Sequence, residues 1–172
     1  MPSWLIRINI RMDQLWAPWR LAYIAKPPAP KADECFLCAG LAADADRDNL
    51  LALRTPQSVV VLNRFPYNNG HLLIAPRAHK GQLHELETGE MMEVMETLRR
   101  MVAVVQDLIK PDGFNIGLNL GRVAGAGLPG HLHWHLVPRW NGDTNFMPVL
   151  TDAKVISQSL DAFWEMLTTA LQ

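Results

Sequence analysis

Residues 131–139 read HLHWHLVPR, a run in which three histidines alternate with apolar residues. In a β-strand, successive side chains point to opposite faces, so His131, His133 and His135 are expected to line one face. The intervening apolar side chains then anchor the other face in the core. The run therefore predicts a half-buried strand that presents a row of imidazoles.

An imidazole titrates near neutrality, and its unprotonated nitrogen can attack phosphorus, accept a proton or bind a metal. The run alone does not choose among these roles. If all three rings were structural, each would need polar partners inside the fold. Chemistry is therefore the leading hypothesis for this strand.

Other apolar runs predict the rest of a sheet, at residues 50–53, 59–62, 71–75 and 113–120. The sequence YNNG at residues 67–70 is typical of a turn, so the first three runs are expected to form an antiparallel meander.

Helical periodicity dominates residues 88–110. Apolar residues recur there at alternating steps of four and three, which predicts a long amphipathic helix with Thr88 as a candidate cap and Pro111 as a stop. A final helix is expected over residues 152–171. We predict an α+β fold, with a five-stranded antiparallel sheet and the long helix packed across it. The periodic positions are Met91, Met95, Leu98, Val102, Val105 and Ile109.

Composition indicates one domain with its own core, since 172 residues suffice without disulfides. The 16 Lys and Arg balance 17 Asp and Glu, so no broad basic field favours duplex nucleic acid or an anionic membrane. No apolar run reaches the roughly 18 residues of a membrane span, and Arg7 interrupts the apolar opening. We therefore expect a cytoplasmic protein.

The N-terminal segment divides into two parts. Residues 1–11 carry no motif, and Met12 is a plausible start, so we expect residues 1–11 to be an extension and residues 12–172 a single domain. The aromatic-rich residues 15–24 are expected to form an arm packed on the body.

Four glycines fall within residues 121–130, between the last two predicted strands. Glycines allow backbone N–H groups to approach an anion closely, so a phosphate-binding loop beside the histidines is expected, with Gly125 and Gly127 as candidate contacts. A plain hairpin loop is the alternative.

Cys35 and Cys38 form the only cysteine pair. In a reducing compartment, a C-x-x-C is more often a metal half-site or a redox pair than a disulfide. Zinc would need two further ligands, for which histidine is the natural source. Reduced thiols without a metal are the alternative.

The run from His131 to Val137 has the form His-φ-His-φ-His-φ-φ, where φ is apolar, and resembles the histidine-triad family of nucleotide hydrolases and transferases. The similarity extends through residues 62–66, residues 70–79 and Asn119, and covers roughly residues 15–148.

The resemblance implies a role for each polar residue of the motif. His133 would be the nucleophile that attacks the α-phosphorus of a nucleotide and forms a nucleotidyl-histidine intermediate. His135 would contact the oxygens around that phosphorus, His71 would complete the site, and Asn119 would hold the phosphate region.

Some family members also bind zinc, and the resemblance assigns the ligands to Cys35, Cys38, His79 and His131, as a structural site. His84 matches nothing in the family and is expected at the surface. The row of histidines would then serve two sites rather than one.

Asn63 stands at the ribose-contacting position, where the phosphoramidase branch has an acidic residue. The resemblance to the fragile-histidine-triad and diadenosine tetraphosphate phosphorylase branches therefore implies a dinucleoside polyphosphate substrate. The family pairs such domains into a homodimer with a continuous sheet, and the apolar seam of the long helix fits that arrangement.

One departure concerns the loop before the triad. Many members have Gln and Ser or Thr where this chain has Gly127 and Leu128. A hydroxyl for the phosphate or leaving group is missing, and backbone N–H groups of the loop would have to replace it. Phosphorylase-like bacterial members also deviate here, which favours inorganic phosphate as the acceptor.

The sequence thus predicts nucleotidyl transfer from a dinucleoside polyphosphate through His133, with phosphate or water as acceptor. A nucleoside phosphoramidase is the alternative enzyme, and a catalytically weak nucleotide-binding sensor is the alternative of another class. A third possibility, a catalytic metal site built from the three triad histidines, predicts that chelation abolishes turnover.

Overall fold

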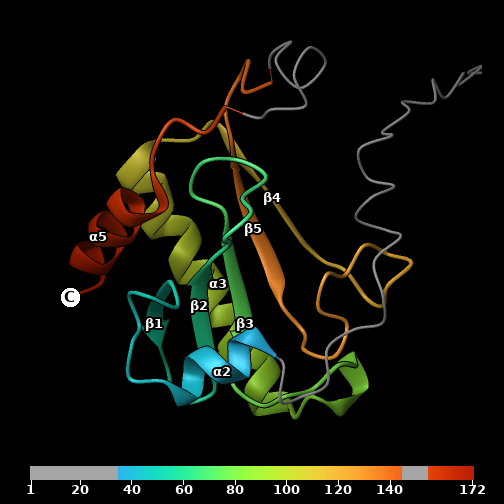
Figure 1. The fold of residues 1–172 in the computed structure, drawn as a ribbon. Helices are drawn as coiled ribbons and strands as arrows, with labels where there is room; N and C mark the ends of the chain where they lie inside the picture. Colours follow the sequence, from blue (N-terminus) through green and yellow to red (C-terminus); the bar gives the residue numbers. More distant parts are fainter. Residues whose placement is uncertain (1–34, 145–154) are drawn as a thin grey trace, which may run out of the picture.

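The computed structural model describes residues 35–144 and 155–172, and its centre is a five-stranded antiparallel sheet (Figure 1). The strand order is β1-β2-β3-β5-β4, so β4 lies at one edge. This architecture confirms the predicted sheet, and β1, β2 and β3 form the expected meander. The strands are β1 (Leu51–Arg54), β2 (Ser58–Leu62), β3 (Leu72–Pro76), β4 (Gly113–Leu118) and β5 (Trp134–Arg139).

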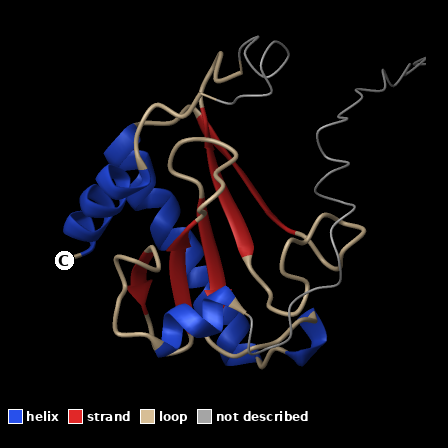
Figure 2. Cartoon of the chain, viewed as in Figure 1, coloured by secondary structure: helices blue, strands red, loops and turns tan. Residues whose placement is uncertain are grey.

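Two of the helices, α3 and α5, pack against each other and against the sheet (Figure 2). The short helices α2 and η2 were not predicted. None of the helices in the two described ranges has the length and apolar character needed to cross a bilayer. The helices are α2 (Phe36–Ala42), η2 (Leu83–Glu85), α3 (Thr88–Ile109) and α5 (Leu160–Leu171).

Helix α3 begins and ends through local backbone chemistry. Its N-cap is Glu87 rather than Thr88, because Glu87 and Glu90 form a reciprocal capping box. At the other end, Lys110 adopts a left-handed conformation with φ of 47° directly before Pro111, which cannot continue the helix.

Helix α5 is shorter than predicted. It begins at Leu160 because the Ser159 side chain accepts a hydrogen bond from Ala162 N and caps it. The predicted segment 152–154 lies outside the described residues, as do residues 1–34 with the proposed extension and aromatic arm.

The register of the strands fixes which side chains share a face. Ser58 Oγ lies 2.9 Å from Thr97 Oγ1 of α3, so the Ser58 side of β2 faces the helix. Alternation and the pairing of β2, β3 and β5 carry this face through Ile74 and Leu136, both fully buried.

The opposite face of the sheet carries the chemistry. Leu73, His135 and Gly117 are cross-strand neighbours there, on β3, β5 and β4. Since α3 packs on the other face, the side chain of His135 lies on the side of the sheet away from this helix, where it is half-buried.

The apolar seam of α3 packs within the chain. Leu98 and Val105 are buried in the core, and the other seam positions lie partly buried against it. The seam therefore does not support the dimer that the sequence suggested. Its apolar residues are accounted for by packing within this chain.

Candidate active site

The triad lies partly outside its strand. β5 begins at Trp134, so His135 belongs to the strand, while His131 and His133 precede it. The prediction that all three occupy one regular strand is therefore wrong in detail. The irregular backbone allows His131 to turn toward another set of partners.

His133 has one engaged ring nitrogen. Its Nδ1 donates to the carbonyl of His131 at 2.8 Å, so the neutral ring carries its proton on Nδ1 and has a lone pair on Nε2. No hydrogen bond to Nε2 is found among the described residues. Burial lowers the pKa of His133 below its ordinary value, which keeps the ring unprotonated near neutrality. These features suit a nucleophile.

A relay of hydrogen bonds fixes the tautomers of the other two histidines. Tyr67 N–H donates to His71 Nδ1 at 3.0 Å, so the proton of His71 stays on Nε2. That Nε2 lies 2.9 Å from His135 Nδ1 and donates to it. His135 must then carry its own proton on Nε2.

His135 Nε2 is a buried atom without a hydrogen-bond partner among the described residues. Burial and the neighbouring His133 lower the pKa of His135 to about 4, so the ring is neutral at physiological pH. Its N–H is therefore an unsatisfied donor beside the candidate nucleophile, where it suits an incoming phosphate oxygen.

Tyr67 is a site residue that sequence reasoning missed. Its ring stacks on His135 at a centroid distance of 5.6 Å and lies 4.7 Å from the His71 ring. The only available signal was its place in the turn before β3. The ring covers one side of the His71–His135 pair.

The turn that precedes His71 packs closely against α3, α5 and β5 at Gly70. A Cβ added to Gly70 would lie 2.8 Å from Ile109 Cδ1 and 3.2 Å from Phe163 Cζ. Gly70 also has a φ of 71°, which other residues rarely adopt. Glycine therefore lets the turn before His71 sit against the helices.

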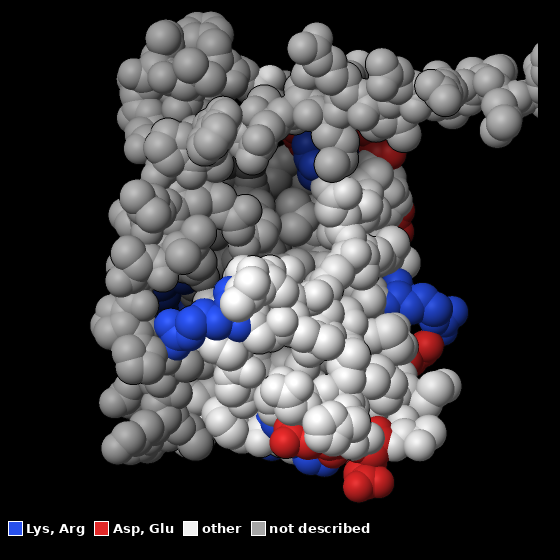
Figure 3. Space-filling model, turned by 90° about the vertical axis from the view of Figure 1, so that its right-hand side faces the viewer, with Lys and Arg blue, Asp and Glu red and all other residues white. Residues whose placement is uncertain are grey.

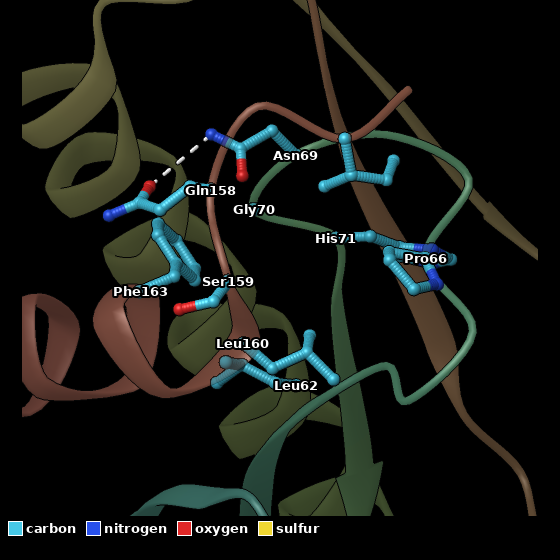
Figure 4. A pocket seen from close by; sticks show the side chains of 10 residues that line it. Leu62, Pro66, Asn69, Gly70, His71, Gln158, Ser159, Leu160 and Phe163 are labelled. Atoms are coloured by element: carbon cyan, nitrogen blue, oxygen red, sulfur yellow. Dashed lines mark hydrogen bonds between the residues drawn. The ribbon is translucent and has the colours of Figure 1, made fainter. Parts of the chain in front are cut away.

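The same region contains a cavity of about 10 Å³, in which Asn69 Nδ2 donates to Gln158 Oε1 at 3.4 Å (Figure 4). Such a volume holds one water molecule at most. It is a packing seam between the turn at residues 66–71 and the start of α5 rather than a ligand site.

Two asparagines flank the histidines. Asn63 Oδ1 accepts from Phe65 N, which directs its Nδ2 toward His71 Nδ1 at 3.2 Å. The β4–β5 register ends with Leu118 opposite Trp134, so Asn119 follows β4 directly at the end of the sheet where His133 precedes β5. Both asparagines therefore belong to the neighbourhood of the histidines.

The glycine loop at residues 121–130 has one of its candidate phosphate-binding N–H groups engaged within the loop itself. Gly125 N already donates to Arg122 O at 3.0 Å within a turn, so this N–H is engaged. No hydrogen bond from Gly127 N is found within the described part of the chain. Phosphate contacts by Gly125 and Gly127 therefore stay predictions.

His131 belongs to a second cluster. Cys35, Cys38, His79 and His131 each offer a ligand atom, and the four atoms lie within 4.8 Å of one another. His131 Nδ1 is 3.3 Å from Cys35 Sγ, and its Nε2 donates to the carbonyl of Pro76 at 2.8 Å. The hydrogen bond to the Pro76 carbonyl fixes which nitrogen of His131 faces the cysteines.

This donor set fits zinc. Two thiols and two imidazoles are typical of closed structural sites, and tetrahedral Zn–S and Zn–N bonds place S and N about 3.6 Å apart. The S···N distances of 3.3 to 3.5 Å agree with that geometry. Burial and the neighbouring Cys35 raise the pKa of Cys38 to about 11, so a cation would supply the charge that favours thiolates.

Among the described residues, this is the only group of three or more such donors close enough to share an ion. It takes His131 alone from the triad. The described residues therefore place the candidate metal site at this cluster rather than at the three triad histidines. His84 is exposed, as expected.

Three clustered histidines, one of them with a ring nitrogen that no described residue engages, suit nucleophilic group transfer. The HIT domain family matches residues 45–142, which is more than half of the chain. The chain therefore belongs to the HIT family.

Similar proteins agree with this assignment. The chain is 35% identical over 164 residues to a Mycobacterium tuberculosis protein named AP-4-A phosphorylase, covering 92% of this chain and 84% of the relative. It is 30% identical over 90 residues to a Schizosaccharomyces pombe protein named bis(5'-nucleosyl)-tetraphosphatase (asymmetrical), covering 52% and 49%. Its fold resembles a zinc-bound histidine triad family protein from Mycobacterium smegmatis, with a TM-score of 0.66, 23% identity, and 82% and 95% coverage.

Proposed function

We propose that this HIT enzyme cleaves diadenosine tetraphosphate or a similar dinucleoside polyphosphate by nucleotidyl transfer through His133. The observation that carries the proposal is the fixed tautomer of His133, which leaves a lone pair on Nε2. The extended similarity to a protein named AP-4-A phosphorylase supports the substrate class.

In the first step, His133 Nε2 attacks the α-phosphorus and forms a P–N bond. The P–O bond to the rest of the substrate breaks, and the departing nucleotide keeps the electron pair. The Nε2–H of His135 donates to an oxygen of the reacting phosphate, where negative charge accumulates. The carbonyl of His131 stabilises the positive charge that develops on His133.

In the second step, an acceptor oxygen attacks the same phosphorus and displaces His133. Inorganic phosphate would yield ADP, and water would yield AMP. The lack of a hydroxyl at Leu128 and the relative named AP-4-A phosphorylase both favour phosphate.

Zinc, when bound by Cys35, Cys38, His79 and His131, supplies a structural crosslink with no open coordination position. These ligands join the start of α2, the segment after β3 and the segment before β5. The crosslink therefore fixes the backbone carbonyl of His131 that orients the nucleophile.

The transferred nucleotide is proposed to bind with its ribose near Asn63 and its phosphate near Asn119. Asn63 is an amide rather than a carboxylate, as in the dinucleoside polyphosphate branch of the family. A nucleoside phosphoramidase is the alternative. It does not account for Asn63, because the phosphoramidase branch has an acidic residue at this position.

We also propose a cytoplasmic homodimer. β4 is an edge strand, and Ile116 on it is 50% exposed, which suits pairing with a second copy. In the view from the β4 side, the described surface is mainly uncharged, with charged side chains at its margins (Figure 3).

The proposed compartment is consistent with the cysteines, since both are free thiols, as a reducing compartment requires. Residues 12–172 are proposed to form the single domain.

The decisive experiment is to incubate the protein with diadenosine tetraphosphate, with and without inorganic phosphate, and to identify the products. ADP with ATP indicates phosphorolysis, whereas AMP with ATP indicates asymmetric hydrolysis. We expect phosphorolysis. If neither condition yields cleavage, the proposed function is wrong.

A further inference from the structure

A trough runs along the histidine face beyond His135. The register places Gly117 opposite His135, Asn115 opposite Val137 and Gly113 opposite Arg139. β4 therefore contributes one amide and two glycines to this face. Next to His135, an open cavity of about 210 Å³ is lined by Tyr67, Asn68, Asn115, Val137 and Arg139.

The glycines of β4 are not required by packing or backbone conformation. A Cβ added to Gly117 or Gly113 meets nothing within 4 Å, and neither residue has a positive φ. A side chain would therefore be tolerated at Gly117, yet it would project into the trough beside His135. The trough is open at these two positions because glycine has no side chain.

The polar groups of the cavity are oriented by an ion pair. Arg139 donates to both carboxylate oxygens of Asp143, from Nε at 2.6 Å and Nη2 at 2.9 Å. Its Nη1 donates to Asn115 Oδ1 at 2.6 Å, which leaves the Asn115 amino group as a donor. No partner for this amino group is found among the described residues.

Asn68 presents the opposite polarity. Its Nδ2 donates to Pro138 O at 3.1 Å and to Asp143 Oδ2 at 2.7 Å, so its Oδ1 is left as an acceptor. One free donor and one free acceptor match the edge of adenine, which offers a ring nitrogen and an exocyclic amino group.

We propose that this trough binds the adenine of the departing nucleotide, through Asn68 and Asn115, with Gly117 leaving room for the polyphosphate. The inference rests on the proposed function, because it presumes a dinucleotide substrate. The transferred half lies toward Asn63, on the β2 side of His71, so the second half must lie on the other side, toward β4.

The position and volume of the cavity suit one nucleoside of a dinucleotide rather than the whole ligand. Val137 is four residues beyond His133, about 13 Å along a strand, so several phosphates are needed to reach it from the reacting phosphorus. A cavity of about 210 Å³ is smaller than the roughly 300–1,000 Å³ of sites that enclose a whole drug-sized ligand.

The test compares binding of AMP with binding of a methylene-bridged, non-hydrolysable diadenosine tetraphosphate analogue, by calorimetry. Gly117→Val fills the trough, and Asn115→Asp removes the donor while keeping an oxygen for Arg139. We expect each variant to weaken the analogue about tenfold and AMP less than about twofold.

Gly89→Val is the matched control, because an added Cβ at Gly89 in α3 makes only ordinary contacts, with Gln57 at 3.5 Å. Equal weakening of both ligands, or no weakening of the analogue, would overturn the inference. A change in oligomeric state of Gly117→Val, measured by light scattering, would also overturn it, because the trough would then be an interface between copies.

Turnover of diadenosine tetraphosphate by the unmodified protein is measured in parallel. If turnover occurs but the variants bind the analogue normally, the trough inference fails and the function stands. If turnover is absent but the analogue loses affinity selectively, the proposed function fails, and the trough is a binding site for the second adenosine of a dinucleotide that the protein does not cleave.

Discussion

His131 and His133 are two residues apart, yet their surroundings assign them to different chemistry. His131 is fully buried, with Nε2 on the carbonyl of Pro76 and Nδ1 facing Cys35 and Cys38. His133 uses only Nδ1, on the carbonyl of His131. One ring is fully engaged, and the other keeps a lone pair.

The difference teaches that the partners of an imidazole, rather than its place in the motif, decide its role. A histidine with both nitrogens engaged holds structure, whereas one with a free nitrogen can react. The same rule separates His71 from His135, because the relay from Tyr67 N ends on the unsatisfied Nε2 of His135.

The strongest test of this comparison is His133→Gln. The glutamine amide can keep a hydrogen bond to the carbonyl of His131, but it is no nucleophile. We expect turnover to fall by roughly a thousandfold or more, with a change in unfolding free energy within about 1 kcal/mol. Turnover and urea denaturation provide the two measurements.

His84→Gln is the control, because His84 is an exposed histidine outside both clusters. It should change neither quantity. Turnover retained in His133→Gln would remove His133 from the nucleophile role. Loss of turnover with unchanged nucleotide affinity would argue against the sensor alternative, provided that function in cells is lost too.

The converse test is Cys35→Ser, which removes a buried ligand from the second cluster. Zinc content should fall, and the melting temperature should drop by roughly 10 °C, since a tightly bound ion stabilises the folded state by several kcal/mol. Turnover at low temperature should fall far less than in His133→Gln.

Chelation of the unmodified protein should reproduce the thermal effect, and added zinc should reverse it. Added zinc should not rescue Cys35→Ser. A protein that purifies without zinc, and whose melting temperature ignores both chelator and zinc, would contradict the metal assignment while leaving the role of His133 intact.

The sequence predicted the parts of the fold that have a clear period. β5 followed from alternation, the other strands from short apolar runs, and α3 from apolar steps of three and four. α2 spans only seven residues and carries no such pattern, so it was missed. The start of α5 was misplaced because the Ser159 cap begins the helix at a point that apolar content does not mark.

The site could be predicted as far as family resemblance reached. The residues of both clusters were named from the motif, but their hydrogen-bond partners were not. His131 meets the carbonyl of Pro76 55 residues away, and Cys35 is 96 residues from His131. Such contacts depend on the tertiary fold and leave no local pattern.

The smallest expected effect concerns pH, and it sharpens the contrast through His135. Burial lowers the pKa of His135 to about 4, whereas its ordinary value is 6.5. Between these values the unfolded chain binds the proton and the folded protein does not. The contribution of His135 to stability is therefore full above about pH 6.5 and declines as the pH falls toward 4.

Because the His135 ring is only partly buried, solvent screening limits the loss to roughly 3 °C in melting temperature. His135→Gln should make the profile less steep in this window without abolishing the slope, because burial also lowers the pKa values of His131 and His133 below 6.5. The carboxylates of Glu85, Glu90 and Glu93, whose pKa values are lowered below the ordinary 4.5, act mainly at more acidic pH. An unchanged profile in His135→Gln would show that the acid sensitivity comes from other groups.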